Sequence, residues 1–146
     1  MDSKIKEKVD KKLRDGWIRS SMMIEVLGTT EKAANLGLDQ HMKKMEKEDK
    51  CIIYNRNLSE IQKAKHPHPK VKLGYSKVIE FEIVTEDFET LIYLVMAYGP
   101  SSVEIHEPEK INMHFGEAQS IVNSLAEMIH RYAAAGLGGI MINATD

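Results

Sequence analysis

The clearest strand signal in the chain is the segment YSKVIEFEIV, residues 75–84, in which apolar and charged residues alternate. Alternation with a period of two places successive side chains on opposite faces of a sheet. One face then carries Ile79, Phe81 and Ile83, and the other carries Val78, Glu80, Glu82 and Val84. The segment therefore predicts a strand with one face buried in the core, and the rest of the fold is inferred outward from it.

The residues after this strand predict a helix and a further strand. Residues 87–97 carry large apolar side chains at the spacing of a buried helix, namely Phe88, Leu91, Ile92, Val95 and Met96. Gly99-Pro100 ends this helix, because glycine favours the turn after a helix and proline cannot continue one. Residues 102–107 predict the next strand.

The residues before position 75 predict a strand, a helix and another strand. Residues 17–27 alternate as a strand, and Gly28 is followed by two threonines, a residue type that caps helices. Residues 31–48 carry their apolar side chains on one side of a helix, and residues 50–55 predict a strand. Residues 56–74 are expected to be irregular, with a turn of helix near residues 58–63.

From residue 17 to residue 107 the predicted order is therefore β-α-β-β-α-β, which defines the ferredoxin-like α+β fold. We expect one antiparallel sheet with strand order 4-1-3-2 and both helices on one face. A helix over residues 3–14 is an addition at one end. Residues 110–142 are an addition at the other, with a fifth strand over 110–114, a helix over 117–134 and an apolar tail at 140–142. The whole chain, residues 1–146, is expected to be a single domain.

The predicted helix and the strand after it carry a local resemblance to a known family. Residues 98–100 read Tyr-Gly-Pro, and residues 103–108 read Val-Glu-Ile-His-Glu-Pro. With the helix before them, these residues resemble the C-terminal extension of WYL-domain regulators, which is itself ferredoxin-like. The resemblance covers residues 85–108 and implies a sensing role. The whole chain also resembles small conserved archaeal proteins of unassigned function.

The predicted sheet has one face that meets the helices and one face that collects acidic groups. Assigned to the helix face are Ile24, Ile53, Phe81, Val103 and Ile105; assigned to the other face are Glu25, Glu80, Glu82, Glu104 and His106. Carboxylates with a histidine are ligands for divalent metals, so one prediction is a metal site, in a metal-binding protein or an enzyme. The alternative is a solvated face, or a face covered by the N-terminal helix or by a second copy of the chain.

A second candidate site lies between the first strand and the helix that follows it. Gly28, Thr29 and Thr30 precede a helix N-terminus, where backbone N–H groups can hold a small anion. These three residues are the predicted ligand-binding site, and a plain tight turn is the alternative. Cys51, the single cysteine, excludes an intrachain disulfide and is not assigned as a nucleophile. No catalytic residue and no cofactor are assigned, so a non-catalytic protein is expected.

The helix over residues 117–134 carries an apolar stripe that suggests contact with another chain. The predicted contact residues are Ile121, Leu125, Met128, Ile129 and Tyr132. Charge is also unevenly distributed, because residues 1–77 hold 18 Lys or Arg and 11 Asp or Glu, whereas residues 78–146 hold 2 and 11. Basic elements would then meet acidic ones within or between chains. We therefore predict a homo-oligomer.

Together these features favour a cytoplasmic, non-catalytic, self-associating module that senses a small ligand. RNA binding through the basic segment 63–77 is an alternative, carried by Lys63, Lys65, Lys70, Lys72 and Tyr75. The net charge of -2 gives no general attraction to nucleic acid. The N-terminal residues lack the apolar core of a secretory signal, and no apolar run is long enough to span a membrane.

Overall fold

The computed structural model describes residues 2–68 and 71–136, with side chains described outside residues 66–72. These residues divide into two compact units. The first unit ends at Ile111 and contains the sheet, and the second begins at Asn112 and contains the helix α4 (Phe115–Ala134). In the part of the chain that is described, no helix is long and apolar enough to cross a membrane.

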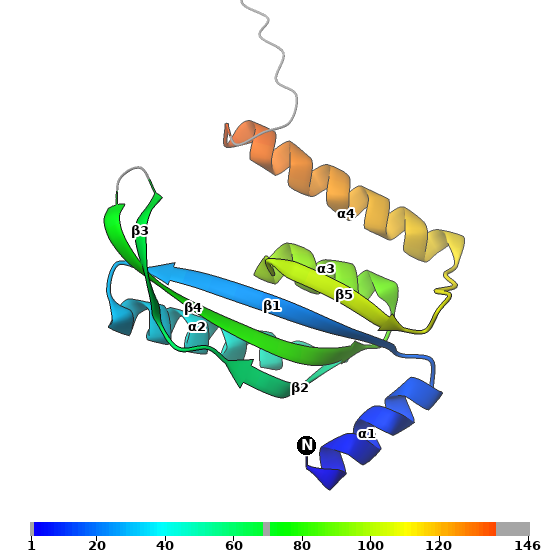
Figure 1. Ribbon diagram of the computed structural model, residues 1–146. Coiled ribbons are helices and arrows are strands. Elements are labelled where there is room, and N and C mark those ends of the chain that lie inside the picture. The colour runs from blue at the N-terminus through cyan, green and yellow to red at the C-terminus, as the bar shows by residue number, and fades with distance from the viewer. Residues whose placement is uncertain (1, 69–70, 137–146) are drawn as a thin grey trace, which may run out of the picture. The chain divides into compact units, whose positions relative to one another are not determined.

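The first unit combines helices with one antiparallel sheet (Figure 1). Its helices are α1 (Ser3–Arg14), α2 (Glu31–Glu46) and α3 (Phe88–Tyr98), and its strands are β1 (Ile18–Gly28), β2 (Cys51–Leu58), β3 (Gln62–His68), β4 (Val71–Thr85) and β5 (Ser102–Glu107). The strand order is β2-β4-β1-β5, and β3 pairs with the outer part of β4. The predicted α+β class and antiparallel sheet are confirmed.

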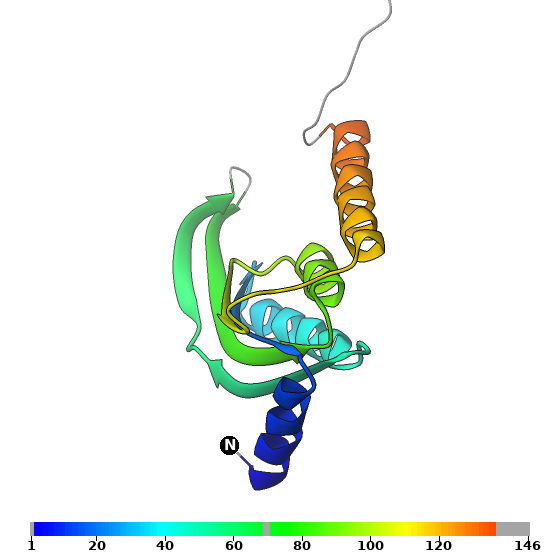
Figure 2. The ribbon, with the colours of Figure 1, turned by 90° about the vertical axis from the view of Figure 1, so that its right-hand side faces the viewer.

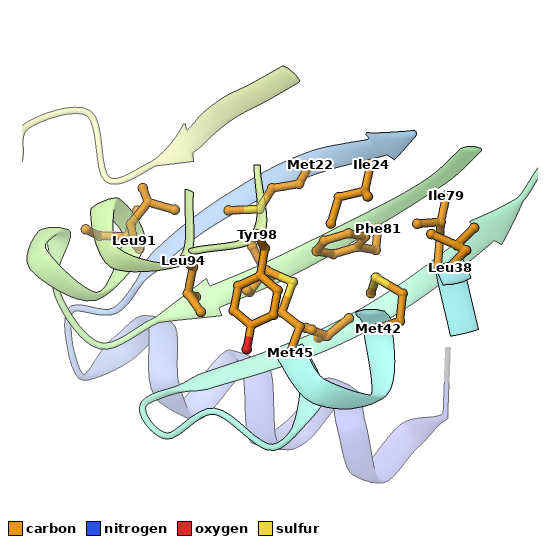
Figure 3. Packing of buried hydrophobic residues seen from close by; sticks show 13 residues of the cluster. Met22, Ile24, Leu38, Met42, Met45, Ile79, Phe81, Leu91, Leu94 and Tyr98 are labelled. Carbon is orange, nitrogen blue, oxygen red and sulfur yellow. The ribbon is translucent and has the colours of Figure 1, made fainter. Parts of the chain in front are cut away.

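The main core lies between the sheet and the helices α2 and α3, which occupy the same side of the curved sheet (Figure 2). The two central strands pair so that Met22 lies opposite Phe81 and Ile24 opposite Ile79. Onto these side chains α2 packs Leu38, Met42 and Met45, and α3 packs Leu91, Leu94 and Tyr98 (Figure 3). The alternation of residues 75–84 therefore predicted the buried face of β4 correctly.

A second, smaller core lies on the opposite face of the sheet, beneath α1. Its buried residues are Val9 of α1, Tyr54 of β2 and Val84 of β4, with Ile5, Leu13, Trp17 and Ile52 packed against them. The apolar side chains of α1 recur every four residues, so they form one stripe on the helix. The added N-terminal helix therefore covers part of the face that the sequence left open.

The segment 56–74 is not the irregular stretch that was predicted. β2 continues to Leu58, and β3 then pairs with an extension of β4, with Lys63 opposite Tyr75. No helical turn forms near residues 58–63, because Ser59 joins the sheet edge: its backbone N–H donates to the Val78 carbonyl over 2.9 Å. The local sequence contains prolines, which edge strands such as β3 tolerate.

The predicted fifth strand over residues 110–114 does not form. These residues lie between β5 and α4 without strand pairing. Ile111 instead packs its side chain against the main core, which fixes the segment without a hydrogen-bonded partner. The helix α4 begins at Phe115, two residues before its predicted start.

β5 faces the direction that was predicted but is not buried. Val103 lies opposite Met22 and Ile105 opposite Ser20, so both point to the helix side of the sheet. They remain 38% and 42% exposed, respectively. Both residues lie on the face to which they were assigned, but they stay partly exposed because β5 is an edge strand and α2 packs over β1 and β4.

Candidate functional sites

The face of β1, β4 and β5 away from α2 and α3, called here the open face, is organised around an arginine. Arg19 of β1 places Nη1 3.1 Å from Glu82 Oε1 and Nε 3.0 Å from Glu107 Oε1. Asn55 also donates from Nδ2 to the second oxygen of Glu82. Arg19 was not among the residues predicted for this face, although the alternation that places Glu25 there also places residue 19 there. Glu82 is therefore engaged in structural contacts.

The other predicted metal ligands lie along the same face. Glu104 and Glu82 flank Ser21 from the two neighbouring strands, and His106 Nε2 lies 2.9 Å from Ser21 Oγ. Glu25 lies opposite Val78, and Glu80 lies opposite Met23. Among residues 2–68 and 71–136, no three His, Cys, Asp or Glu side chains form a group that could hold a metal ion. The metal site stays a prediction to which this geometry adds no support.

A depression of about 520 Å³ opens on this face between β1, β4 and β5. Ser21, Met23, Glu80, Ser102 and Glu104 contribute to its lining. Its charged groups are both acidic, and its floor is the sheet itself. Acidic and hydroxyl groups of this kind are well hydrated at a protein surface, so the depression has an ordinary structural explanation.

Tyr54 is a buried phenol at the edge of the open face, beneath α1. Its side chain is only 3% exposed, and its hydroxyl has no hydrogen-bond partner among the described residues. Burial, and then the nearby carboxylate of Glu82, whose effect exceeds the opposing effect of Arg19, raise the pKa of Tyr54 to about 12. A phenol with this pKa stays neutral at physiological pH, so it is not a general base.

Cys51 behaves as a structural thiol. Its Sγ donates to the Glu48 carbonyl over 3.5 Å. Burial, and then the negative charges of Glu48 and Asp49, raise the pKa of Cys51 to about 11. Since the thiolate is the nucleophile, a thiol that remains protonated at neutral pH is inert. This agrees with leaving Cys51 out of any catalytic site.

The predicted anion site at residues 28–30 has a close backbone approach at its centre. Thr30 caps α2, because its Oγ1 accepts from the Ala33 N–H over 3.0 Å. A Cβ added to Gly28 would lie 2.5 Å from the Ala34 nitrogen. Packing of the strand end against the helix start thus explains the glycine without a ligand, and Glu31 adds a negative charge to the first turn. Binding at Gly28, Thr29 and Thr30 stays a prediction.

The basic segment 63–77 is a β-hairpin arm. Lys63 and Lys65 are exposed on β3 and lie opposite Tyr75 and Leu73 of β4, so the four share one face of the arm. The side chains of Lys70 and Lys72 lie outside the described residues. RNA binding by this arm stays a prediction.

The second unit is built on α4, whose exposed apolar side chains follow a heptad. Phe115, Val122, Leu125, Ile129 and Tyr132 are between 40% and 84% exposed. With Ala118 they recur at alternating spacings of three and four residues, which is the a/d pattern of a coiled coil. We call these six residues the α4 seam. Of the predicted contact residues, Leu125, Ile129 and Tyr132 belong to the seam, whereas the buried Ile121 and the half-buried Met128 lie outside its spacing.

The structure is that of a small α+β protein in which Arg19, Glu82 and Glu107 join neighbouring strands of the sheet. The model of the MJ0538 family matches residues 19–140, and the chain belongs to this family. The match agrees with the resemblance to small conserved archaeal proteins, whereas nothing supports the resemblance to WYL-domain regulators. No curated protein and no solved structure matches the chain.

Proposed function

We propose that this protein is a non-catalytic module that associates with a second copy of itself through α4 and senses a small ligand with its sheet unit. The observation that carries self-association is the α4 seam, an exposed apolar surface with heptad spacing. A helix face of this kind is stabilised when a second helix covers it. The non-catalytic assignment is supported by Glu82 and Glu107, which are held by Arg19, and by the protonated thiol of Cys51.

The flanks of the seam favour a second copy over a foreign partner. In coiled coils, charges at the flanking positions choose the partner. Here these positions hold Gln119, Ile121, Ala126 and Met128, none of which is charged. Two identical α4 helices therefore meet without like-charge repulsion, and one patch serves both copies of a two-fold dimer.

We further propose that the sheet unit is a variant of the ferredoxin-like fold. Support comes from the order β1-α2-β2-β4-α3-β5 and the strand order β2-β4-β1-β5. In this proposal α1 and β3 are additions to the basic pattern. α1 covers part of the sheet face opposite α2 and α3, and β3 extends the sheet by pairing with β4. A fold of this kind is compatible with a ligand-sensing module, but a fold alone does not specify an activity.

The self-association is tested by light scattering across a concentration series from about 1 to about 500 µM, because a dimer obeys mass action. The expected mass rises from the monomer value of 16.6 kDa to twice that value. Leu125→Glu places a charge in the middle of the seam and is expected to keep the chain monomeric throughout. Asn123→Glu adds the same charge on α4 outside the seam and is expected to leave the dimer intact.

Two results would contradict the proposal. One is a wild-type chain that remains monomeric at the highest concentration. The other is a Leu125→Glu variant that melts at a lower temperature but has an unchanged mass profile, because the seam would then pack within its own chain.

A further inference from the structure

We propose that a pocket between α2 and the side of β2 and β4 that faces α2 binds a small organic carboxylate with a short apolar body. This α2 pocket has a volume of about 190 Å³. It lies within the first unit and shares no lining residue with the predicted anion site at residues 28–30. The inference rests on the ligand-sensing part of the proposed function and is independent of self-association.

A β-bulge in β2 gives the α2 pocket one of its walls. Tyr54 lies opposite Glu82 but Asn57 lies opposite Glu80, so β2 contains one residue more than β4 over this interval. Asn55 takes up the extra length in the left-handed region, with φ of 52°. Bulges of this kind re-aim a side chain. Here Arg56 turns toward α2 and places Nη2 2.8 Å from Glu46 Oε1.

The interior of the α2 pocket is apolar. Leu38 and Met42 of α2 and Ile79 of β4 line it and are at most 5% exposed, and Leu58 adds an apolar wall from β2. A volume of about 190 Å³ equals about six waters at the ~30 Å³ that each occupies in the liquid. This space suits a body of four or five carbons and is too small for a nucleotide.

The charged groups around the α2 pocket leave one cation for a ligand. Arg56 is paired with Glu46, and Asp39 is paired with Lys43 over 3.0 Å. Lys77 donates to the amide oxygen of Asn35 over 2.7 Å, and within the described residues no carboxylate lies within ion-pair distance of its ammonium. An ammonium has three donors, so Lys77 retains capacity for an anion. A carboxylate on Lys77 places its apolar tail toward Leu38, Met42 and Ile79.

The probe is 4-methylpentanoate, titrated into the full chain with ¹³C labels on the methionine and isoleucine methyl groups. The expected result is a saturable shift of the Met42 and Ile79 signals, with no comparable shift for Met22. Two matched probes divide the ligand into its parts. The alcohol 4-methylpentan-1-ol lacks the carboxylate and acetate lacks the tail, and each is expected to bind at least about tenfold more weakly, since a hydrogen bond to a charged group has about that effect.

Variants of the chain locate the anion contact. Lys77→Met is expected to weaken binding of 4-methylpentanoate by about tenfold or more, and Lys77→Arg to retain it within a few-fold. Lys8→Met removes the same charge from α1, which packs on the other face of the sheet, and is expected to leave binding unchanged. Circular dichroism of each variant verifies that the sheet unit is folded.

The inference is overturned if the Met42 and Ile79 signals do not shift saturably at millimolar 4-methylpentanoate. Shifts spread equally over all methyl groups overturn it too, as does binding that Lys77→Met leaves intact. None of these outcomes alters the mass series that tests self-association, so the two proposals fail separately.

Discussion

Gly28 offers the sharpest test of how the sheet and α2 are joined. Replacing it by alanine would place a Cβ 2.5 Å from the Ala34 nitrogen, 2.9 Å from the Thr30 oxygen and 3.0 Å from the Ala34 Cα. All three atoms belong to the backbone, so no side-chain rotation relieves the overlap. The start of α2 must move away from β1, which disturbs the packing of Ala34 and Leu38.

The expected cost of Gly28→Ala is about 2–3 kcal/mol, at the upper end of the usual range for overpacking. Gly37→Ala, within α2, is the matched control. A Cβ at Gly37 meets nothing within 4 Å, and alanine is the better helix former, so this variant should gain about 0.5–1 kcal/mol. The same chemical change therefore has opposite signs at two positions nine residues apart.

Urea unfolding followed by circular dichroism measures both effects. With an m-value of about 1–3 kcal/mol/M, the midpoint of Gly28→Ala should fall by about 0.7–3 M, and that of Gly37→Ala should rise slightly. A midpoint for Gly28→Ala equal to that of wild type would refute the close approach of strand and helix. It would also favour the alternative that Gly28 is part of a ligand-binding site.

Three further predictions concern polar groups. Arg19→Leu leaves Glu82 and Glu107 without their cation, so it should lower the free energy of unfolding by about 1–2 kcal/mol at low salt and by less in about 1 M NaCl. The control Arg14→Leu should stay within about 0.5 kcal/mol of wild type. Urea titrations measure both variants. The folded state holds the protons of Cys51 to about pH 11 and of Tyr54 to about pH 12, above ordinary values of 9.0 and 10.0. It therefore binds more protons than the unfolded state, and stability should fall as pH rises from about 9 to about 12. In melting curves over this range, Tyr54→Phe should make the loss of stability above pH 10 less steep. At pH 7 its stability should match that of wild type or exceed it by up to about 1 kcal/mol. If the loss of stability with pH is unchanged in this variant, the burial of the phenol is contradicted. Asp87 accepts from the Thr90 N–H over 2.8 Å and from the Thr90 hydroxyl over 2.6 Å. In thermal unfolding, Asp87→Ala should therefore lower stability by about 1–2 kcal/mol, and Asp87→Asn by much less. Equal losses in the two variants would argue against a capping role.

The central part of the fold was predictable because its signals are local. The alternation of residues 75–84 placed Ile79, Phe81 and Ile83 on the buried face, and the helix between Asp87 and Gly99 has a capping residue at one end and a glycine at the other. Each pattern needs only the neighbours of a residue in the chain. That is why β1, α2, α3 and β5 lie close to their predicted positions.

The candidate ligand site was not predictable in the same way, because it depends on strand register. Nothing in the sequence around Asn55 indicates that β2 gains one residue against β4 there, and the extra residue turns Arg56 toward Glu46. The extension of β4 beyond Tyr75 was missed for a related reason. Residues 71–74, Val-Lys-Leu-Gly, alternate but are few, and they are held in the sheet by pairing with β3.

Arg19 neutralises part of the charge imbalance between the two halves of the chain. Arg19 belongs to the basic half and pairs with Glu82 and Glu107 of the acidic half, whereas Arg56 pairs with Glu46 inside the basic half. The sequence suggested that basic elements meet acidic ones within or between chains. The α4 seam is apolar with uncharged flanks, so an interface built on it gains stability from burial of apolar surface, which salt does not screen. Association through the seam should therefore persist in about 1 M NaCl, where an interface made of ion pairs would weaken. In this proposal the uneven charge stabilises the sheet unit through Arg19, and self-association depends on the apolar α4 seam.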